Sequence, residues 1–241
     1  MYQYEAVIQA MEQLGGYAPL GQLYQASLKI PGAEWGTKTP YATIRRVVQE
    51  RKEFFKIRPG LWALKSHKHK LPEPLKAGKE TKAKSKEVEL FDHTYYQGLL
   101  VQIGNLQKYI TYVPAQDKNR KFLGKDKLDE LVTTTTIFDF TYPFIVNSAK
   151  SIDVIWFNQS QLPKAVFEVE HSTDIKNSLI KFVELQDFRT EMKIVADEAR
   201  RGQFEKVLSS RAFQEIQKIV GFVSYTQISN EHTNLFLKSY L

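Results

Sequence analysis

Two short apolar segments that carry acidic residues constrain the fold of this chain more than any other feature. They lie in SIDVIWFNQSQLPKAVFEVEHSTDI, residues 151–175, on either side of a polar segment. Both segments are rich in β-branched and aromatic residues and bounded by polar ones, a pattern that predicts β-strands. Asp153 opens the first segment, and Glu168 and Glu170 close the second.

The spacing of these acids predicts a shared site. Glu168 and Glu170 are two residues apart, so their side chains project from one face of a strand, about 7 Å apart. If a neighbouring strand brings Asp153 beside them, the three carboxylates repel one another and raise each other's pKa. A divalent cation relieves that repulsion, and oxygen ligands favour Mg²⁺ or Mn²⁺. The residues alone leave open that the acids face solvent and pair with Lys or Arg.

The basic charge is concentrated in the first third of the chain. The 241 residues carry a formal net charge of +7. Residues 1–88 contain 16 Lys and Arg against 8 Asp and Glu, whereas residues 89–241 contain 18 against 19. A basic module joined to a near-neutral one indicates nucleic-acid binding at one end. The alternative is that the lysines only increase solubility.

Several classes of protein are excluded or disfavoured by what the sequence lacks. Cysteine is absent, which excludes disulfides and thiolate metal sites and fits a reducing compartment. No apolar run approaches the roughly 18 residues that span a bilayer, and no secretory signal is visible, so we expect a cytoplasmic protein without membrane contact. Nucleotide-binding loops, the serine-hydrolase elbow and zinc-peptidase motifs are also absent.

Residues 1–66 are predicted to form a winged helix-turn-helix domain. Apolar residues recur at helical spacing near the N-terminus, a short helix is expected over 20–28, and a third helix follows Thr39, a candidate N-cap, and Pro40. The segment FFKIRPGLWALK then predicts a β-hairpin around a Pro-Gly turn. Three helices followed by a hairpin are the winged helix-turn-helix plan.

The third helix and its entry carry polar residues that the core does not need. Arg and Gln side chains can contact phosphates or base edges in the major groove. The candidate DNA-binding residues are Lys38, Thr39, Tyr41, Arg45, Arg46 and Gln49. A protein-binding module with a solvated basic helix is the alternative.

The entry GTKTP at 36–40, with Phe55, Gly60, Ala63 and Leu64 after it, resembles the HARE-HTH family. The resemblance covers roughly residues 1–66, with Thr37 as an insertion. It implies a winged helix-turn-helix module that targets DNA and performs no reaction itself.

A linker and an α/β domain are predicted to follow. Residues 67–88 hold seven Lys, two Pro and no aromatic residue, a composition typical of an extended linker. Residues 89–241 alternate helical and β-prone segments. They include helices over 92–107 and 174–188, strands at YITYVPA and MKIVA, a β-rich TTTTIFDFTYPFIV, helices at DEARRGQFEKVL and RAFQEIQKI, and a closing strand at VGFVSY. This order predicts an α/β/α sandwich around a mixed sheet.

The acid-bearing strands resemble the PD-(D/E)XK nuclease superfamily, the fold of many restriction endonucleases. Asp153 matches its first acid and Glu168 its second, while Glu170 stands where Lys is usual, as it does in some restriction enzymes of the superfamily. The resemblance extends over roughly residues 90–225, including FEVEHSTDI and LIKFVELQ. It implies that Asp153 and Glu168 bind Mg²⁺, with Mn²⁺ as a substitute, and that Glu170 orients or activates water.

Two further site residues are expected from the same resemblance. Gln97, four residues after His93 on a helix, would act near the metal or the scissile phosphate. The alternative for Gln97 is a hydrogen-bonded polar residue where the helix meets the sheet. His171 would contact the metal-bound water or the substrate, or only hold Glu170.

Together these features indicate a Mg²⁺-dependent endonuclease of the type II restriction class that acts on double-stranded DNA. Cutting both strands requires two sites, so a homodimer is expected. Two alternatives stay open. One is a non-catalytic DNA-binding regulator with a degenerate nuclease fold, since the usual Lys is missing. The other is a nuclease that acts on modified DNA or on RNA.

Overall fold

The computed structural model describes residues 1–76, 82–172 and 175–238, without the side chains of 82–84. The chain forms two compact units, Met1–Val88 with Ser229–Leu241 and Glu89–Ile228, and each is described by itself. Part of the predicted linker and the predicted helix start at Asp174 lie outside the described residues.

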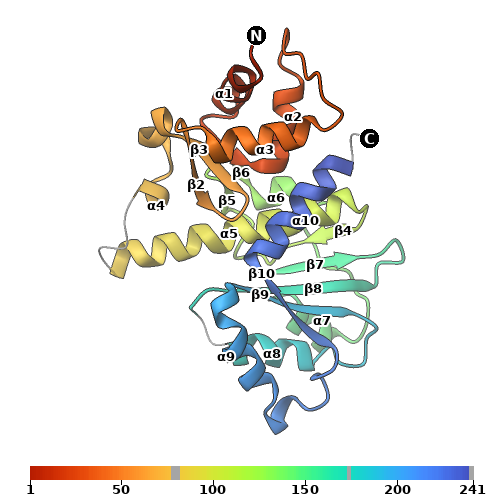
Figure 1. The fold of residues 1–241 in the computed structure, drawn as a ribbon. Helices are drawn as coiled ribbons and strands as arrows, with labels where there is room; N and C mark the ends of the chain where they lie inside the picture. Colours follow the sequence, from red (N-terminus) through yellow and green to blue (C-terminus); the bar gives the residue numbers. More distant parts are fainter. Residues whose placement is uncertain (77–81, 173–174, 239–241) are drawn as a thin grey trace. The chain divides into compact units, whose positions relative to one another are not determined.

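Three helices and a three-stranded antiparallel sheet make up most of the first unit. The elements are α1 (Gln3–Gln13), β1 (Tyr17–Pro19), α2 (Leu20–Leu28), α3 (Pro40–Glu50), β2 (Phe54–Arg58) and β3 (Leu61–Leu64), with strand order β1-β3-β2 (Figure 1). Apolar residues of all three helices, including Met11, Leu23 and Ile44, form its core. The predicted helices and hairpin are present, and β1 is an addition that periodicity over three residues could not indicate.

The C-terminal helix α10 (Tyr225–Lys238) contributes its residues from Ser229 onward to this unit, although the sequence assigned residues 89–241 to the second domain. Ser229 donates a hydrogen bond to the carbonyl of Pro59, at 2.8 Å. A side chain on Gly21 would meet Phe236 at 2.9 Å, so α10 packs closely here.

Helical structure occupies much of the segment that the sequence assigns to a linker. A 3₁₀ helix, η1 (Lys65–Lys70), a short α4 (Glu73–Lys76) and the start of the long α5 (Lys82–Leu106) lie there. Lys and Glu are good helix formers, so the lysine-rich composition that favours an extended chain also allows a helix to begin early.

A five-stranded mixed sheet is the centre of the second unit, which confirms the α/β class. Its strands are β4 (Ile110–Tyr112), β7 (Val154–Phe157), β8 (Pro163–Glu170), β9 (Glu191–Ala196) and β10 (Val220–Ser224), in the order β10-β9-β8-β7-β4. Strands β4, β7 and β8 pair antiparallel, whereas β8, β9 and β10 run parallel. The acid-bearing strand β8 is therefore central and is buried along most of its length.

Helices cover both faces of this sheet (Figure 1). On one face α5 packs closely, and Trp156 of β7 donates its indole N–H to the Leu100 carbonyl at 3.1 Å. On the other face α7 (Pro143–Ala149), α8 (Ile175–Val183) and α9 (Arg201–Leu208) share one apolar core with the strands. The remaining short elements are β5 (Lys121–Phe122), β6 (Asp126–Lys127), α6 (Leu128–Leu131), η2 (Glu198–Arg200) and η3 (Arg211–Phe213).

The prediction of β-structure in TTTTIFDFTYPFIV is wrong. Residues 132–142 form no strand, and α7 begins at Pro143. The aromatic residues that suggested a strand instead pack on the core, where Phe138 lies edge-on to Phe157. Strand propensity depends on a pairing partner and a half-buried surface, and this segment has no strand partner.

The C-terminal predictions need two smaller corrections. RAFQEIQKI forms only η3 and turns, and VGFVSY does not close the fold because α10 follows it. Among the described residues, no helix has the length and apolar content that crossing a lipid bilayer requires.

Candidate active site

The three predicted acids meet where β7 begins and β8 ends. Asp153 directly precedes β7. Glu170 is the last residue of β8, and Glu168 lies two residues before it. They are 8%, 2% and 4% exposed, so none of them faces solvent. Buried carboxylates need partners or protonation, and the surrounding residues show how each is accommodated.

Antiparallel pairing of β7 with β8 brings Asp153 beside Glu168. The backbone N–H of Asp153 donates to Oε1 of Glu168 at 3.3 Å, and the N–H of Val169 donates to Oδ2 of Asp153 at 2.7 Å. These bonds hold the two carboxylates at the strand ends. The other oxygen of Asp153, Oδ1, points toward α5, where it lies 3.5 Å from Nε2 of His93.

A single hydroxyl on α8 joins the two glutamates. Ser178 Oγ lies 3.1 Å from Oε2 of Glu168 and is also in hydrogen-bond contact with Oε1 of Glu170. Both glutamates therefore project toward α8, as their spacing of two residues predicts.

Lys181, one turn further along α8, supplies an ammonium group at this site. Its Nζ donates to both oxygens of Glu168, at 2.9 and 2.8 Å, and to the carbonyl of Ser151 at 2.9 Å. Lys164, the lysine nearest to the motif in sequence, instead pairs with Glu191 at 2.9 Å on the exposed surface. The ammonium group beside the buried Glu168 thus comes from the helix that follows β8.

The electrostatics of this pair follow from burial and crowding. Burial, and then repulsion from Asp153, raise the pKa of Glu168, and Lys181 opposes both effects. Burial alone would lower the pKa of Lys181, but attraction to Glu168 outweighs it and raises that pKa. The ammonium is therefore held charged at neutral pH.

The end of β8 is also fixed by α10 and by the segment after β9. The Tyr225 hydroxyl donates to the backbone carbonyl of Glu170 at 2.8 Å and lies 2.8 Å from Nδ1 of His171. Arg200 lies 3.8 Å from Oε2 of Glu170. Tyr96 stacks on Tyr225 with ring centroids 3.8 Å apart. His171 thus contacts the same hydroxyl that anchors Glu170.

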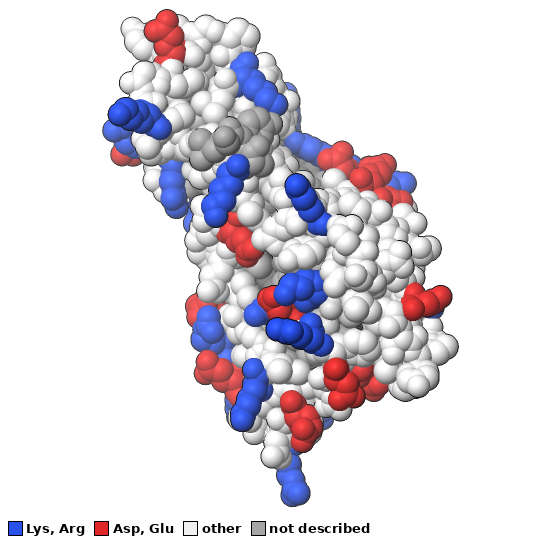
Figure 2. Space-filling model, turned by 90° about the vertical axis from the view of Figure 1, so that its right-hand side faces the viewer, with Lys and Arg blue, Asp and Glu red and all other residues white. Residues whose placement is uncertain are grey.

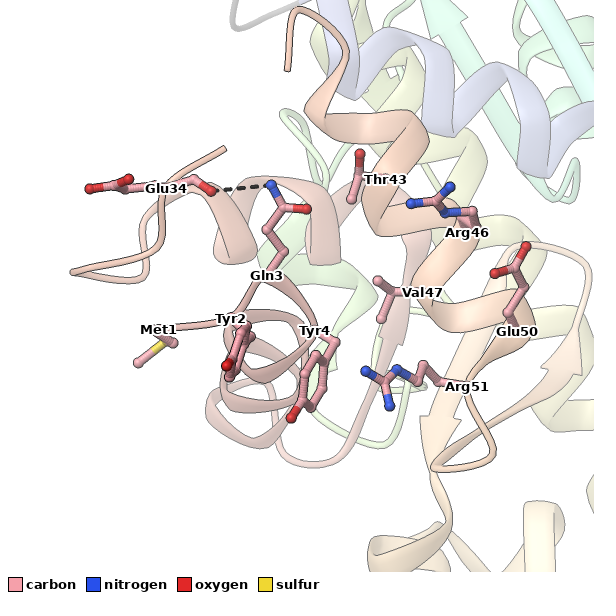
Figure 3. A pocket seen from close by; sticks show the side chains of 10 residues that line it. All are labelled: Met1, Tyr2, Gln3, Tyr4, Glu34, Thr43, Arg46, Val47, Glu50 and Arg51. Atoms are coloured by element: carbon pink, nitrogen blue, oxygen red, sulfur yellow. Dashed lines mark hydrogen bonds between the residues drawn. The ribbon is translucent and has the colours of Figure 1, made fainter. Parts of the chain in front are cut away.

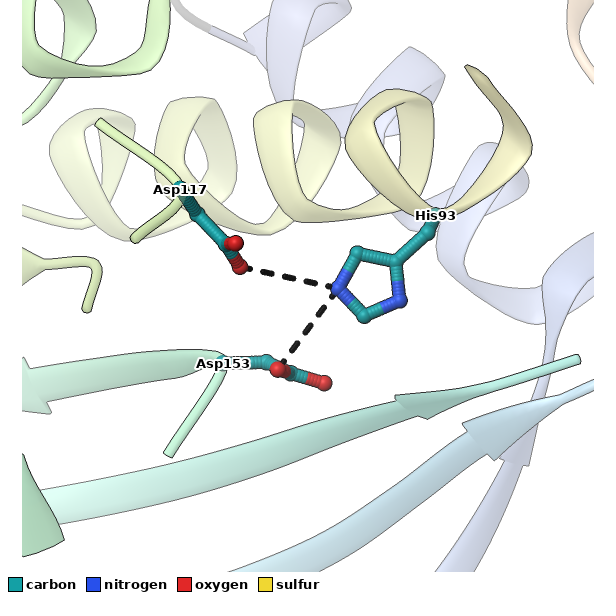
Figure 4. Close-up of side chains that lie close together, drawn as sticks. All are labelled: His93, Asp117 and Asp153. Carbon is teal, nitrogen blue, oxygen red and sulfur yellow. Dashed lines mark ion pairs between the residues drawn. The ribbon is translucent and has the colours of Figure 1, made fainter. Parts of the chain in front are cut away.

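A second group of polar side chains faces Asp153 from the side of α5 (Figure 4). His93 projects from α5, and its Nε2 lies 3.7 Å from Oδ2 of Asp117, a loop residue after β4. Gln97, fully buried, donates to Oδ2 of Asp117 at 2.7 Å and to the carbonyl of Asp153 at 3.1 Å. These contacts agree with the alternative stated for Gln97, a hydrogen-bonded polar residue where the helix meets the sheet.

Attraction between these groups holds His93 in its charged form. Burial lowers the pKa of His93, but the carboxylates of Asp117 and Asp153 together outweigh it and raise the pKa to about 9. Arg120 lies 2.9 Å from the other oxygen of Asp117. Burial raises the pKa of Asp117, and its partners His93, Gln97 and Arg120 reverse that effect, so the net shift is downward.

The candidate DNA-binding residues lie on and before α3 in the first unit. Lys38, Thr39, Arg45, Arg46 and Gln49 are exposed. Tyr41 is different, because it is half-buried and its ring lies 5.5 Å from that of Tyr24. Thr39 occupies the N-cap position, but its side chain forms no capping hydrogen bond.

The exposed residues of α3 point in two directions. Arg45 and Gln49 are four residues apart and share one face of the helix. Arg46 lines a pocket of about 470 Å³ between α3 and the start of α1, together with Arg51, whose guanidinium lies 3.7 Å from the Tyr4 ring centroid (Figure 3). On the face drawn in Figure 2, basic and acidic side chains are interspersed and neither forms one continuous patch.

Sequence reasoning missed Lys181, Ser178, Asp117 and Arg200. A signal existed for the first two, because Ser178 and Lys181 are three apart and interrupt the apolar stripe of α8, of which Ile175, Leu179 and Phe182 are fully buried. Polar side chains on the buried stripe of a helix indicate a polar partner on the sheet. Asp117 and Arg200 carry no such signal, because Asp117 lies in a turn after β4 and Arg200 in the three-residue helix η2 after β9.

Comparison with known proteins assigns the family. Residues 71–239 match the family model described as the type II restriction enzyme NmeDI C-terminal domain. The match covers more than half of the chain, which therefore belongs to this family.

A curated protein is similar in sequence to part of this chain. Over 134 residues the chain is 26% identical to the type II restriction enzyme NmeDI of Neisseria meningitidis serogroup C. The aligned region covers 52% of this chain and 38% of that protein. The chain thus corresponds to less than half of the length of this relative. No solved structure shows a significant match.

The raised pKa of His93 predicts how stability depends on pH without metal. A folded-state pKa of about 9, above the ordinary 6.5, means that the stabilisation is complete below about pH 6.5 and is lost as pH rises through 9. Wild type should therefore lose on the order of 3 kcal/mol more unfolding free energy over this range than His93→Gln does.

Urea unfolding in chelator at several pH values measures this difference. His69→Gln, which changes an exposed histidine of the first unit, should keep the wild-type pH dependence. Equal slopes for wild type and His93→Gln would show that the two carboxylates do not hold the imidazolium.

Proposed function

We propose that this chain is a Mg²⁺-dependent DNA endonuclease of the type II restriction class, with a PD-(D/E)XK-like second unit and a winged helix-turn-helix first unit. The observation that carries the proposal is the burial of Asp153, Glu168 and Glu170 together at the strand ends, with the Lys181 ammonium on Glu168. Family membership supports the same activity. Because the chain matches only 38% of the curated relative, its own activity and substrate are part of the proposal.

Asp153 and Glu168 would hold the Mg²⁺ ion. Their carboxylate oxygens are the hard donors that Mg²⁺ and Mn²⁺ prefer, and their mutual repulsion favours a cation between them. A bound ion would lower the pKa of its water and stabilise negative charge on the scissile phosphate. Lys181 now bonds both oxygens of Glu168, so metal binding requires it to release at least one of them.

Lys181 would then act where the superfamily's lysine is usual. Freed from one oxygen of Glu168, its ammonium can donate to a phosphate oxygen or orient the attacking water while still paired with the other oxygen. Electrostatic groups that are already in position at neutral pH stabilise the charge that develops during attack. Glu170 would orient the water or accept its proton, held in place by Ser178 and Arg200.

Gln97 and His171 are proposed as positioning residues. Gln97 ties Asp117 to the backbone of Asp153, so it keeps the first acid in register. His171 contacts the Tyr225 hydroxyl, which holds the carbonyl of Glu170, and this favours the expectation that His171 holds the end of β8.

The first unit would hold the duplex. Lys38, Arg45 and Gln49 are exposed at the entry to and along α3, where they can contact phosphates and base edges. A homodimer would place two sites on opposite strands of a palindromic target. These assignments extend the sequence prediction and rest on exposure and charge.

The central test is cleavage of unmethylated phage and plasmid DNA with Mg²⁺, with chelator, and by Asp153→Asn and Glu168→Gln. We expect discrete fragments from the wild type with Mg²⁺ only, and a loss on the order of 100-fold or more in each variant. Glu191→Gln, at the exposed start of β9, is the matched control and should cleave normally. Intact DNA in every lane, with binding retained and methylated DNA and RNA also uncut, would favour a DNA-binding regulator.

Substitution of Lys181, with Lys164 as the control, tests whether the ammonium group on Glu168 takes part in cleavage. Lys164 is the control because it pairs with Glu191 on the exposed surface. Lys181→Ala should reduce single-turnover cleavage on the order of 100-fold, while Lys164→Ala should leave it unchanged. Lys181→Arg keeps the charge but alters the geometry and should restore only part of the rate. If Lys181→Ala cleaves like wild type while folded, the ammonium takes no part in the reaction.

DNA binding by α3 is tested without cleavage, in chelator, by fluorescence anisotropy on a short duplex. Arg45→Ala should weaken binding and reduce the slope of log K against log salt by about 1 for the lost phosphate contact. Arg211→Ala removes an exposed arginine of the second unit and should change neither quantity. An unaltered slope for Arg45→Ala would remove Arg45 from the interface.

A further inference from the structure

We propose that His93, Asp117 and Asp153 form a second metal site, which takes a divalent transition-metal ion in exchange for the proton on Nε2 of His93. The inference rests on the proposed function in one respect, since Asp153 belongs to both ligand sets. It differs in its ligands, because an imidazole nitrogen and a loop carboxylate join Asp153 here and Glu168 takes no part.

The three side chains already converge. One ligand atom from each lies within 4.8 Å of the other two. Nε2 of His93 is 3.5 Å from Oδ1 of Asp153 and 3.7 Å from Oδ2 of Asp117 (Figure 4). Two ligands that bind one tetrahedral ion at about 2.1 Å lie about 3.4 Å apart. The observed separations are therefore close to those of ligands around one ion, and longer than good hydrogen bonds.

Among the described residues, two buried polar atoms at this place lack a hydrogen-bond partner, and a bound cation would supply each with a contact. Within the described part of the chain, Nε2 of His93 and Oε1 of Gln97 are buried and have no hydrogen-bond partner. Gln97 is 0% exposed, and its amide lies between Asp117 and the backbone of Asp153. Such atoms are rare in folded proteins, and contact with a bound ion or water is one explanation for them.

Outer partners hold the carboxylates in orientation. Oδ2 of Asp153 accepts from the N–H of Val169, which leaves Oδ1 directed at His93. Oδ1 of Asp117 lies 2.9 Å from Arg120, which leaves Oδ2 for Gln97 and His93. Metal ligands are commonly fixed in this way by hydrogen bonds and charges behind them.

The donor set decides the kind of ion. Carboxylates and water suit Mg²⁺, Ca²⁺ and Mn²⁺, whereas imidazole suits the later first-row metals. One nitrogen and two carboxylates therefore favour a transition-metal ion over Mg²⁺. The Asp153–Glu168 pair offers oxygen alone, so the two sites should differ in their selectivity.

Mn²⁺ is the probe, because its electron spin reports bound ligands directly. The purified full chain, without DNA, is titrated with Mn²⁺, and pulsed EPR records the coupling to ¹⁴N. We expect a nitrogen coupling in wild type that disappears in His93→Gln. Asp117→Asn should weaken binding at this site at least about 10-fold, while Asp126→Asn, an exposed aspartate on β6, should not.

The deciding measurement uses Glu168→Gln, which lacks a ligand of the oxygen-only site. Mn²⁺ bound to this folded variant without nitrogen coupling would overturn the inference. Equal Mn²⁺ affinity after adding His93→Gln or Asp117→Asn to it, each shown to be folded by thermal melting, would also overturn it. Glu168→Gln separates this site from the proposed function, because it should abolish cleavage and leave the nitrogen coupling. Nitrogen-coupled Mn²⁺ in a protein that never cleaves DNA would sustain the site and reject the nuclease.

Discussion

Burial of like charges is the constraint on which the end of the sheet depends. Asp117, Asp153, Glu168 and Glu170 are all almost inaccessible to solvent. Isolated buried carboxylates are unfavourable by several kcal/mol each, so each needs a cation or several donors. The chain supplies both from separate elements, namely α5, α8 and the segment after β9.

These partners divide into two sides of the strand pair. Lys181 and Ser178 on α8 serve the two glutamates, whereas His93 and Gln97 on α5 serve Asp117 and Asp153. Removing a cationic partner such as Lys181 or His93 would leave a buried carboxylate without its counter-charge. The polar residues on each side therefore stabilise the folded state together. A bound metal ion would replace part of this neutralisation on either side.

The sequence predicted the centre of the site better than its surroundings. Acids at positions i and i+2 share one face of any strand, and Ser178 does contact both Glu168 and Glu170. Lys181 and Asp117 come from elements far away in the chain, and no local rule specifies which helix turn or loop reaches the strand end. The same limit applies to the fold. Strong helical periodicity identified α1 and α3, whereas residues 132–142 have β-prone side chains without a partner strand.

Strand β8 is where the sheet changes from antiparallel to parallel pairing. The parallel strands β8, β9 and β10 have their carboxyl ends on the same side of the sheet. Glu170 ends β8, Arg200 follows β9 and Tyr225 follows β10. Ligands of open α/β sheets bind outside the carboxyl ends of parallel strands. Arg200 and Tyr225 reach Glu170 from the segments that follow two of these ends. A change in the segment after β9 or at the start of α10 would therefore displace the end of the acid-bearing strand, although neither element carries one of the three acids.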